Sequence, residues 1–184
     1  MPKYDHLFAK IALQRKDIRI IFFSSTETER RFLRERLVKV FAESGLIFSE
    51  HCEVLPWLTK RAFFDLMASS TIAIDTPAFS GFNTAIQSIW CDLPMVTIRG
   101  GFLRNRLAAG VLERIGLEDL AADTEEQYLS IVNTLLCNES VLKEKRDHIK
   151  SHKHRIFRDV TPIREFENFI HREMTNHRQT LSPL

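Results

Sequence analysis

Residues 72–98, IAIDTPAFSGFNTAIQSIWCDLPMVTI, decide the fold of this chain. They begin and end with short apolar runs, at 72–75 and 95–98, which predict two buried strands. Between the two runs lies a loop rich in turn residues, followed by an amphipathic segment that predicts a helix reaching Cys91. A strand, a helix and a second strand in this order form the unit from which parallel sheets are built.

The rest of the chain repeats this alternation of apolar runs and amphipathic segments. Apolar runs predict further strands at residues 18–23 and 52–55. Helical spacing and capping residues predict helices at 4–15, 27–44, 59–69, 104–115, 140–153 and 161–174, with another helix after a capping box at Thr124–Gln127. Together these elements predict an α/β class of fold, a three-layer, Rossmann-like arrangement around a mostly parallel sheet.

Composition indicates one globular domain over residues 1–184, ending in a frayed tail at 175–184. The 184 residues are 44% hydrophobic and 27% charged, which is enough apolar material for a core and excludes disordered and collagen-like classes. No linker, internal repeat or low-complexity segment divides the chain. Its three cysteines are far apart and in no CxxC spacing, so we expect core thiols of a reducing compartment.

Charge and hydropathy argue against nucleic acid and membranes as partners. The net charge is only +2, and the basic stretch Lys143–Arg155 has no interleaved aromatic residue, which favours a solvated helix face. No apolar run approaches the roughly 20 residues that cross a bilayer, and the first ten residues lack the apolar stretch of a secretory signal. We therefore expect a soluble, cytoplasmic protein.

The junction at residues 74–88, IDTPAFSGFNTAIQS, is richest in candidate binding residues. Ligands of open α/β sheets bind beyond the carboxyl ends of the strands, next to helix N-termini. Gly81 would let the backbone approach a ligand, and a helix starting at Ser80 or Asn83 offers free N–H groups to a phosphate. Gln87 lies one turn further along and can reach a ribose. The competing interpretation is a glycine turn before a capped helix, with no ligand. Physical arguments alone give this interpretation about half the weight.

Basic residues at two other junctions are weaker candidates. Lys60 starts a helix soon after the strand at 52–55, and its positive charge there is unfavourable next to the positive end of the helix dipole. This placement suggests contact with a ligand, and the competing interpretation is a solvated surface lysine. Arg104 and Arg106 follow a strand and a double glycine, so that their guanidinium groups either bind phosphate or remain solvated.

Other chemistries find little support in the sequence. His148 and His152 have a metal-compatible spacing but no acidic or cysteine partner nearby, so we expect surface histidines and no metal site. We find no serine elbow, no Walker loop and no Cys–His pairing. A phosphoacceptor receiver domain using Asp75 would need an acidic pair after the first strand, and the sequence there is FFSSTE.

Three segments in a fixed order resemble one known family. They are VLPWLTKRAFFDLMASSTIAIDTP at 54–77, GFNTAIQSIWCDLPMVT at 81–97 and GFLRNRLAAGVLERIGL at 101–117. They resemble the C-terminal catalytic half of the SPINDLY/O-GlcNAc-transferase-like glycosyltransferases, family 41, which have the two-lobed GT-B fold. Residues 2–23 are similar to the helix and strand at the start of this lobe.

The resemblance implies a set of residues that bind a nucleotide-sugar donor. In the family, the lysine matching Lys60 contacts the donor phosphates, and the acidic residue that commonly reaches the ribose is replaced here by Gln87. Phe63 and Phe82 stand where the animal enzymes have histidines. The implied donor-binding set is Lys60, Phe63, Ser80, Gly81, Phe82, Asn83, Thr84 and Gln87, with Arg104 and Arg106 as further phosphate contacts.

The implied function is donor binding for inverting, metal-independent glycosyl transfer to a protein. The donor would be a UDP-N-acetylglucosamine-type nucleotide sugar, no cofactor is implied, and no catalytic residue is assigned. The family's tetratricopeptide repeats, N-terminal lobe, first strand and lysine-bearing loop have no counterpart in this sequence. The alternative is a non-catalytic lobe that serves assembly or protein interaction. A missing strand and lobe would expose apolar surface, which predicts a homo-oligomer.

Overall fold

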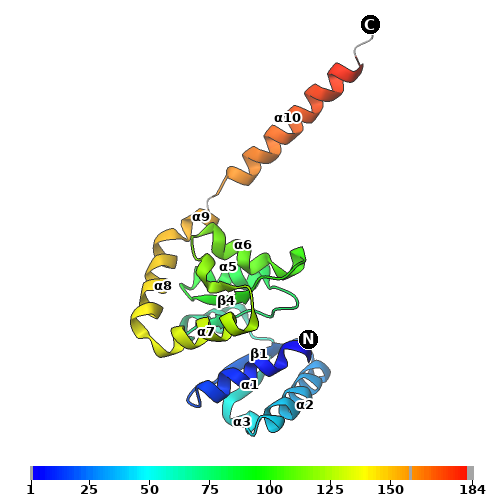
Figure 1. The fold of residues 1–184 in the computed structure, drawn as a ribbon. Coiled ribbons are helices and arrows are strands. Elements are labelled where there is room, and N and C mark those ends of the chain that lie inside the picture. The colour runs from blue at the N-terminus through cyan, green and yellow to red at the C-terminus, as the bar shows by residue number, and fades with distance from the viewer. Residues whose placement is uncertain (1, 158, 182–184) are drawn as a thin grey trace.

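The computed structural model describes residues 2–157 and 159–181, in which helices alternate with short parallel strands (Figure 1). The strands are β1 (Ile20–Ser24), β2 (Cys52–Pro56), β3 (Ala73–Ile74), β4 (Met95–Ile98) and β5 (Ala121–Ala122). The helices up to β4 are α1 (Asp5–Gln14), α2 (Glu27–Glu43), α3 (Phe48–His51), α4 (Lys60–Ser69) and α5 (Phe82–Trp90). The later helices are α6 (Leu107–Arg114), α7 (Glu125–Cys137), α8 (Glu139–His152), α9 (His154–Phe157) and α10 (Thr161–Leu181). The predicted α/β class is confirmed.

Short 3-10 turns complete the chain and account for one of the differences from the predicted helices; the short helices α3 and α9 were not predicted at all. The 3-10 turns are η1 (Pro2–Tyr4), η2 (Leu103–Asn105) and η3 (Glu118–Leu120). The helix predicted from residue 104 starts only at Leu107, because η2 occupies the preceding residues. The last helix, predicted to end at Met174, continues to Leu181, so residues 175–181 of the expected frayed tail are helical; residues 182–184 lie outside the described residues.

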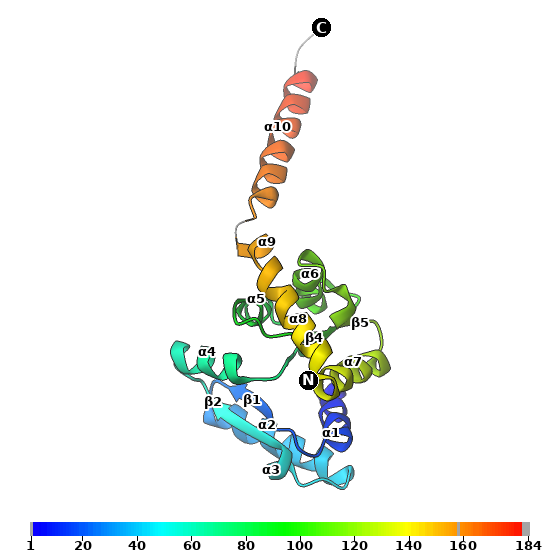
Figure 2. The ribbon, with the colours of Figure 1, turned by 90° about the vertical axis from the view of Figure 1, so that its left-hand side faces the viewer.

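The strands form two parallel sheets. β1 pairs with β2 from Ile20↔Cys52 to Ser24↔Pro56, and the second sheet has the order β3-β4-β5. Figure 2 shows α4 and α5 on one side of β1 and β4, with α1 and α7 on the other. The sequence predicted the layering, but it did not predict the break between β1 and β3.

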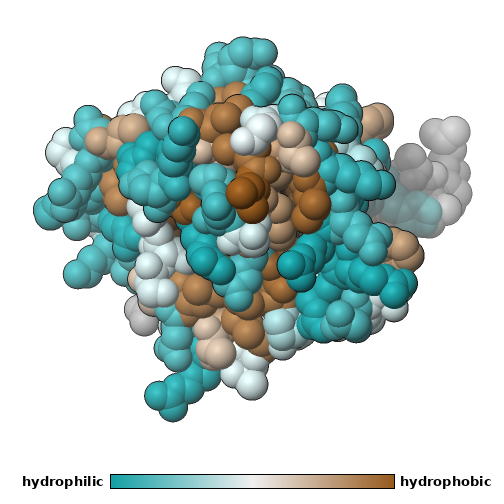
Figure 3. All heavy atoms as spheres, turned by 90° about the horizontal axis from the view of Figure 1, so that it is seen from below, coloured by the Kyte–Doolittle hydropathy of each residue, from teal (hydrophilic) through white to brown (hydrophobic). Residues whose placement is uncertain are grey.

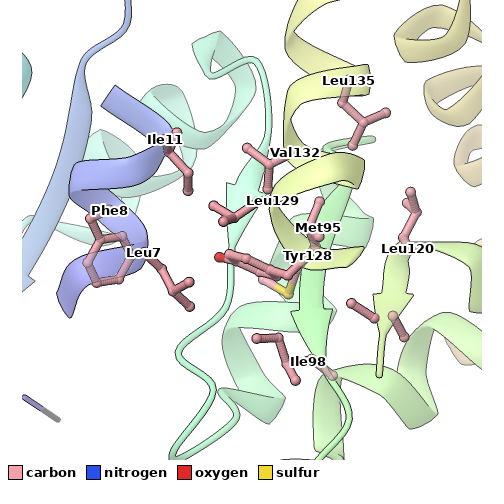
Figure 4. Close-up of a cluster of buried hydrophobic side chains, with 14 of the residues drawn as sticks. Leu7, Phe8, Ile11, Met95, Ile98, Leu120, Tyr128, Leu129, Val132 and Leu135 are labelled. Carbon is pink, nitrogen blue, oxygen red and sulfur yellow. The ribbon is translucent and has the colours of Figure 1, made fainter. Parts of the chain in front are cut away.

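A core of buried apolar residues joins the two sheets through α1 and α7. Figure 4 shows Leu7 and Ile11 of α1 facing Leu129 and Val132 of α7, with Met95 of β4 beneath. Each of these side chains is at most 9% exposed. This packing is what holds the β1–β2 part of the molecule against the β3–β5 part.

Apolar side chains also remain at the surface. Figure 3, viewed from the side on which α1, α2 and α3 lie, shows hydrophobic side chains among hydrophilic ones. At the opposite end, α10 projects away from the body of the molecule (Figure 1). Among the described side chains of α10, Ile163, Phe166, Phe169, Ile170 and Met174 are exposed apolar residues.

Candidate functional site

A buried carboxylate organises the loop that follows β3. Asp75 is only 5% exposed and accepts three hydrogen bonds, from Ser80 Oγ at 2.6 Å, Gly81 N at 3.0 Å and Thr97 Oγ1 at 2.8 Å. Hydrogen bonds to a charged group are stronger than those between neutral groups, so this cluster fixes the loop. Its burial and its three internal donors also leave Asp75 unsuited to the phosphoacceptor role considered above.

Ser80 connects this loop to the segment that follows β4. Its Oγ accepts a hydrogen bond from Ala108 N at 2.8 Å, and its own N–H donates to the carbonyl of Arg104 at 2.8 Å. The start of α6 and the start of α5 are therefore held by one serine. The two strand-to-helix junctions, treated separately in the sequence, form one site at the carboxyl edge of the β3–β5 sheet.

Asn105 provides the second connection between the same loops. Its Nδ2 donates to the carbonyls of Pro77, at 2.8 Å, and Ala78, at 2.7 Å. A Cβ atom on Gly100 would lie 2.3 Å from the Cβ of Asn105. Gly100 thus allows the close approach that puts the asparagine against the loop.

Helix α5 presents its N-terminus at this site. Its N-cap is Gly81, whose N–H is already bonded to Asp75, so the helix starts at Phe82, between the two predicted starts. The first intrahelical bond runs from Ala85 N to Gly81 O, which leaves the N–H groups of residues 82–84 without helical partners. Phe82, Asn83 and Thr84 are exposed, whereas Gln87 is half-buried.

Lys60 and Phe63 lie on α4, next to the end of β1. Thr59 caps this helix by accepting from Ala62 N at 3.3 Å, which places Lys60 at the first helical position. The Lys60 side chain is exposed and makes no hydrogen bond or ion pair within the described part of the chain. Phe63 packs edge-on against Phe23 of β1, with ring centroids 5.5 Å apart. Lys60 is therefore available to a ligand, whereas Phe63 contributes to packing.

The two candidate arginines remain exposed beside the Ser80 loop. The Arg104 guanidinium stacks over the Phe102 ring, 4.6 Å from its centroid. The Arg106 side chain forms no ion pair with any residue that the structure describes. Exposed cationic side chains thus lie beside this loop, and the carboxylate of Asp75 is already hydrogen-bonded within it.

The histidine pair on α8 serves packing in this structure. The rings of His148 and His152 stack with centroids 4.0 Å apart, and His148 Nε2 lies 2.7 Å from the carbonyl oxygen of Ile115. Within residues 2–157 and 159–181, no three His, Cys, Asp or Glu side chains gather in a way that could hold a metal ion.

Several residues of the site were not found in the sequence. Asp75 was considered only as a phosphoacceptor, and the roles of Thr97 and Asn105 depend on contacts 22 and 28 residues apart in the chain. Large apolar side chains are also exposed in the segments that follow β2, β3 and β4: Trp57, Phe79, Phe102 and Leu103 are 64–79% exposed. Exposed aromatic residues directly after predicted strands were the signal available for this rim.

The fold is that of an α/β protein with parallel strands and loops gathered at their carboxyl ends. Comparison with known proteins identifies the family. The model of glycosyl transferase family 41 matches residues 59–164. The chain belongs to glycosyl transferase family 41.

Individual relatives support this assignment over shorter ranges. A probable UDP-N-acetylglucosamine–peptide N-acetylglucosaminyltransferase SPINDLY of Hordeum vulgare is 26% identical over 119 residues, 64% of this chain and 12% of the relative. A UDP-N-acetylglucosamine–peptide N-acetylglucosaminyltransferase of Caenorhabditis elegans is 35% identical over 60 residues, 33% of this chain and 5% of the relative. This chain therefore spans only a small part of the curated relatives it matches.

A solved structure shows that the fold matches over almost the whole chain. An O-GlcNAc transferase of Thermobaculum terrenum superposes with a TM-score of 0.86 at 22% identity, covering 98% of this chain and 35% of the solved one. The expected GT-B-type fold is confirmed by this match. Of the described helices, none is both long and apolar enough to cross a membrane.

Proposed function

We propose that this chain is the lobe of a family 41 protein O-glycosyltransferase that binds the nucleoside diphosphate of a UDP-N-acetylglucosamine-type donor. The observation that carries the proposal is the N-terminus of α5. Its N–H groups at residues 82–84 have no helical partners, and Asp75 and Ser80 fix the loop that presents them. A helix N-terminus with free amides is suited to a phosphate group.

Charge at the site fits an anionic ligand. Lys60, Arg104 and Arg106 are exposed, and the described structure pairs none of them with a carboxylate. The amides and Lys60 would stabilise the charge that develops on the leaving diphosphate, a contribution that a metal ion supplies in other transferases. We therefore propose metal-independent binding and an inverting reaction.

The remaining donor contacts follow from the positions of two side chains. Gln87 lies half-buried one turn into α5, where its amide can hydrogen-bond a ribose hydroxyl. Phe82 is 50% exposed at the first position of the same helix and offers an apolar surface to the base or the sugar. Asn83 and Thr84 offer polar groups beside the free amides.

Transfer itself requires more than residues 1–184. The chain covers 35% of the solved transferase, and acceptor and donor must be held together for reaction. We expect residues 1–184 to bind donor but to transfer no sugar to a peptide. Transfer by these residues alone would contradict this expectation.

Calorimetric titration with UDP tests the proposed site. Lys60→Ala should remove a charge-assisted bond worth about 1.5–3 kcal/mol, weakening UDP binding roughly ten- to a hundredfold. Lys39→Ala removes another exposed lysine, from α2, and should leave the affinity unchanged. Affinity should be the same with EDTA as with Mg²⁺.

Two results would overturn the proposal. Equal UDP affinity of the Lys60→Ala variant and the unsubstituted chain would place the diphosphate elsewhere. Absence of affinity for UDP, GDP and their sugars would favour the second candidate, a non-catalytic lobe that binds protein. The exposed rim of Trp57, Phe79, Phe102 and Leu103 is the observation behind that candidate, since such apolar groups mark interaction surfaces.

A further inference from the structure

Ser80 has no hydrogen-bond donor left for a ligand. Its side chain is only 1% exposed. A serine hydroxyl carries one proton, and Ser80 donates it to Asp75 Oδ2 at 2.6 Å. The backbone N–H of Ser80 is bonded to the carbonyl of Arg104 at 2.8 Å. A diphosphate is bound by hydrogen-bond donors, so Ser80 is unsuited to direct contact, although the family resemblance includes it in the donor-binding set.

The hydrogen bonds of Ser80 instead enclose Arg106. Ser80 holds Arg104 through the carbonyl of that residue and Ala108 through its N–H, at 2.8 Å in both cases. Arg106 lies midway between these two anchored residues and is the N-cap of α6. Its side chain is exposed and forms no ion pair within the described part of the chain. Ser80 therefore fixes the backbone segment that carries this exposed guanidinium group.

The N-terminus of α5 is held by bonds that do not involve the Ser80 side chain. Gly81, its N-cap, donates to Asp75 Oδ1 at 3.0 Å, and Thr97 of β4 donates to Asp75 Oδ2 at 2.8 Å. Loss of the Ser80 hydroxyl would therefore leave α5 attached to β4 through Asp75. It would release the start of α6, which packs beside α5 (Figure 1). The hydroxyl thus sets where Arg106 stands relative to the free amides of α5.

We propose that Ser80 is a positioning residue that holds Arg106 beside the N-terminus of α5, so that the two groups bind the two phosphates of one diphosphate. This inference rests on the proposed donor site. The α5 amides hold one phosphate, and the Arg106 guanidinium donates paired N–H groups to the other. A guanidinium on a loosened segment must be ordered when the ligand binds, which lowers affinity. Ser80 therefore determines the preference for a nucleoside diphosphate over a monophosphate.

Calorimetric titrations with UDP and UMP test this role. UMP lacks the second phosphate, so the ratio of the two affinities isolates the contribution of that phosphate, whereas a general loss of stability affects both ligands alike. Ser80→Ala should lower the UDP-to-UMP affinity ratio at least about fivefold. Ser88→Ala is the matched control, because Ser88 lies on α5, is fully buried and donates to the Leu93 carbonyl at 2.8 Å. It should leave the ratio unchanged.

A double-mutant cycle determines whether Ser80 acts through Arg106. Arg106→Gln removes the guanidinium group and should by itself lower the UDP-to-UMP ratio at least about fivefold. In the Arg106→Gln background, Ser80→Ala should have almost no further effect on the ratio, because no guanidinium group remains to be positioned. Effects that multiply in the double variant would show that Ser80 acts by another route, and would overturn the proposal.

Two further measurements separate positioning from a general loss of structure. Ser80→Cys keeps nearly the size of the side chain, but a thiol hydrogen-bonds only weakly. This variant should also lower the UDP-to-UMP ratio, and it replaces Ser80→Ala if that variant does not fold. Amide hydrogen exchange should become faster at Ala108, whose N–H loses its acceptor, and stay slow at Ala85, whose N–H is bonded to the Gly81 carbonyl. Equal acceleration at both amides would contradict a selective release of α6.

Failure of this inference is distinguishable from failure of the proposed function. If the unsubstituted chain binds UDP, and the Ser80 variants keep its UDP-to-UMP ratio, the positioning role is overturned and the donor site stands. Equal affinity of the unsubstituted chain for UDP and UMP would overturn the arrangement of two phosphates and leave a nucleotide site. No affinity for UDP would overturn both the positioning role and the proposed function.

Discussion

Asp75 is central to the site's geometry, because three donors converge on its carboxylate: Ser80 and Gly81 from the loop after β3, and Thr97 from β4. Asp75→Asn places an amide donor against these donors and removes the charge. We expect a loss of about 2–4 kcal/mol in the free energy of unfolding, measured by urea denaturation. Asp65→Asn on α4, whose side chain is 74% exposed, should change stability by less than about 0.5 kcal/mol. A loss for Asp75→Asn as small as for Asp65→Asn would contradict this account.

The two glycines after β4, Gly100 and Gly101, allow a test of the close approach between the Gly100 backbone and Asn105. Gly100→Ala would put a Cβ 2.3 Å from that of Asn105, whereas nothing lies within 4 Å of a Cβ on Gly101. We therefore expect Gly100→Ala to cost about 1–3 kcal/mol of stability and Gly101→Ala to cost almost nothing. Thermal unfolding of the two variants side by side measures the difference. Equal melting temperatures would show that Asn105 moves away freely.

Contacts between the loops assign structural roles to residues of the candidate site that residue types alone did not indicate. Gly81 was singled out for backbone approach, but its φ is negative, and a Cβ there would meet Thr84 Oγ1 at 3.2 Å. Gly81 thus favours a tight turn against Thr84 and Asp75. Asn105 could not be assigned from sequence, because its partners Pro77 and Ala78 become neighbours only when both loops fold.

At the scale of elements, apolar runs located four of the five described strands to within about two residues. β5, Ala121–Ala122, was missed because two alanines carry no strand signal, and it forms only through its register with Thr97 and Ile98. The capping signal at Thr124 was correct, since its side chain accepts from Gln127 N. The Gln127 side chain, however, bonds the N–H of Asp123 instead of that of Thr124.

The capping box that the structure shows in full starts α2. Thr26 Oγ1 accepts from Glu29 N at 3.2 Å, and the Glu29 carboxylate accepts from Thr26 N at 3.3 Å. Thr26→Ala should cost about 1 kcal/mol of stability in urea denaturation at pH 7. The matched control is Thr134→Ala within α7. The Thr134 hydroxyl donates to the Ser130 carbonyl and caps no helix, so this substitution should cost less stability than Thr26→Ala. Equal losses for the two variants would contradict a capping role for Thr26.

The same capping box makes the stability of the protein depend on pH. Hydrogen bonds from the Ser25 hydroxyl and from Thr26 lower the pKa of Glu29 below its ordinary value of 4.5. A carboxyl group whose pKa is lowered by folding stabilises the protein at pH values above its ordinary pKa. This stabilisation is lost as the pH falls through the lowered pKa. Glu29→Gln should therefore be less stable than the unsubstituted chain at pH 7, and urea denaturation should show that the difference shrinks as the pH falls below the ordinary carboxyl value of 4.5. A difference that stays constant over this range would contradict a role for the charge.

At the scale of the whole molecule, sequence patterns predicted an α/β fold but not its interruption. The apolar character of β1 and β3 is the same whether or not a neighbouring strand pairs with their free edges, so hydropathy does not reveal the break between the two sheets. Only the pairing register, which joins β1 to β2 and β3 to β4, reveals the free edges.

The exposed face of α10 predicts how the molecule behaves in solution. Phe166 is 65% exposed and Ile170 is 40% exposed, and with Ile163 and Met174 they follow the three- and four-residue spacing that puts side chains on one helix face. Because this helix projects from the body, its apolar face favours association between copies. We expect a dimer or larger species in light scattering after size exclusion. The double variant Phe166→Glu with Ile170→Glu should shift the mass to that of a monomer, whereas Glu165→Gln should not. A monomer for the unsubstituted chain at high concentration would exclude association through α10, and an oligomer that survives the double variant would contradict α10 as the interface.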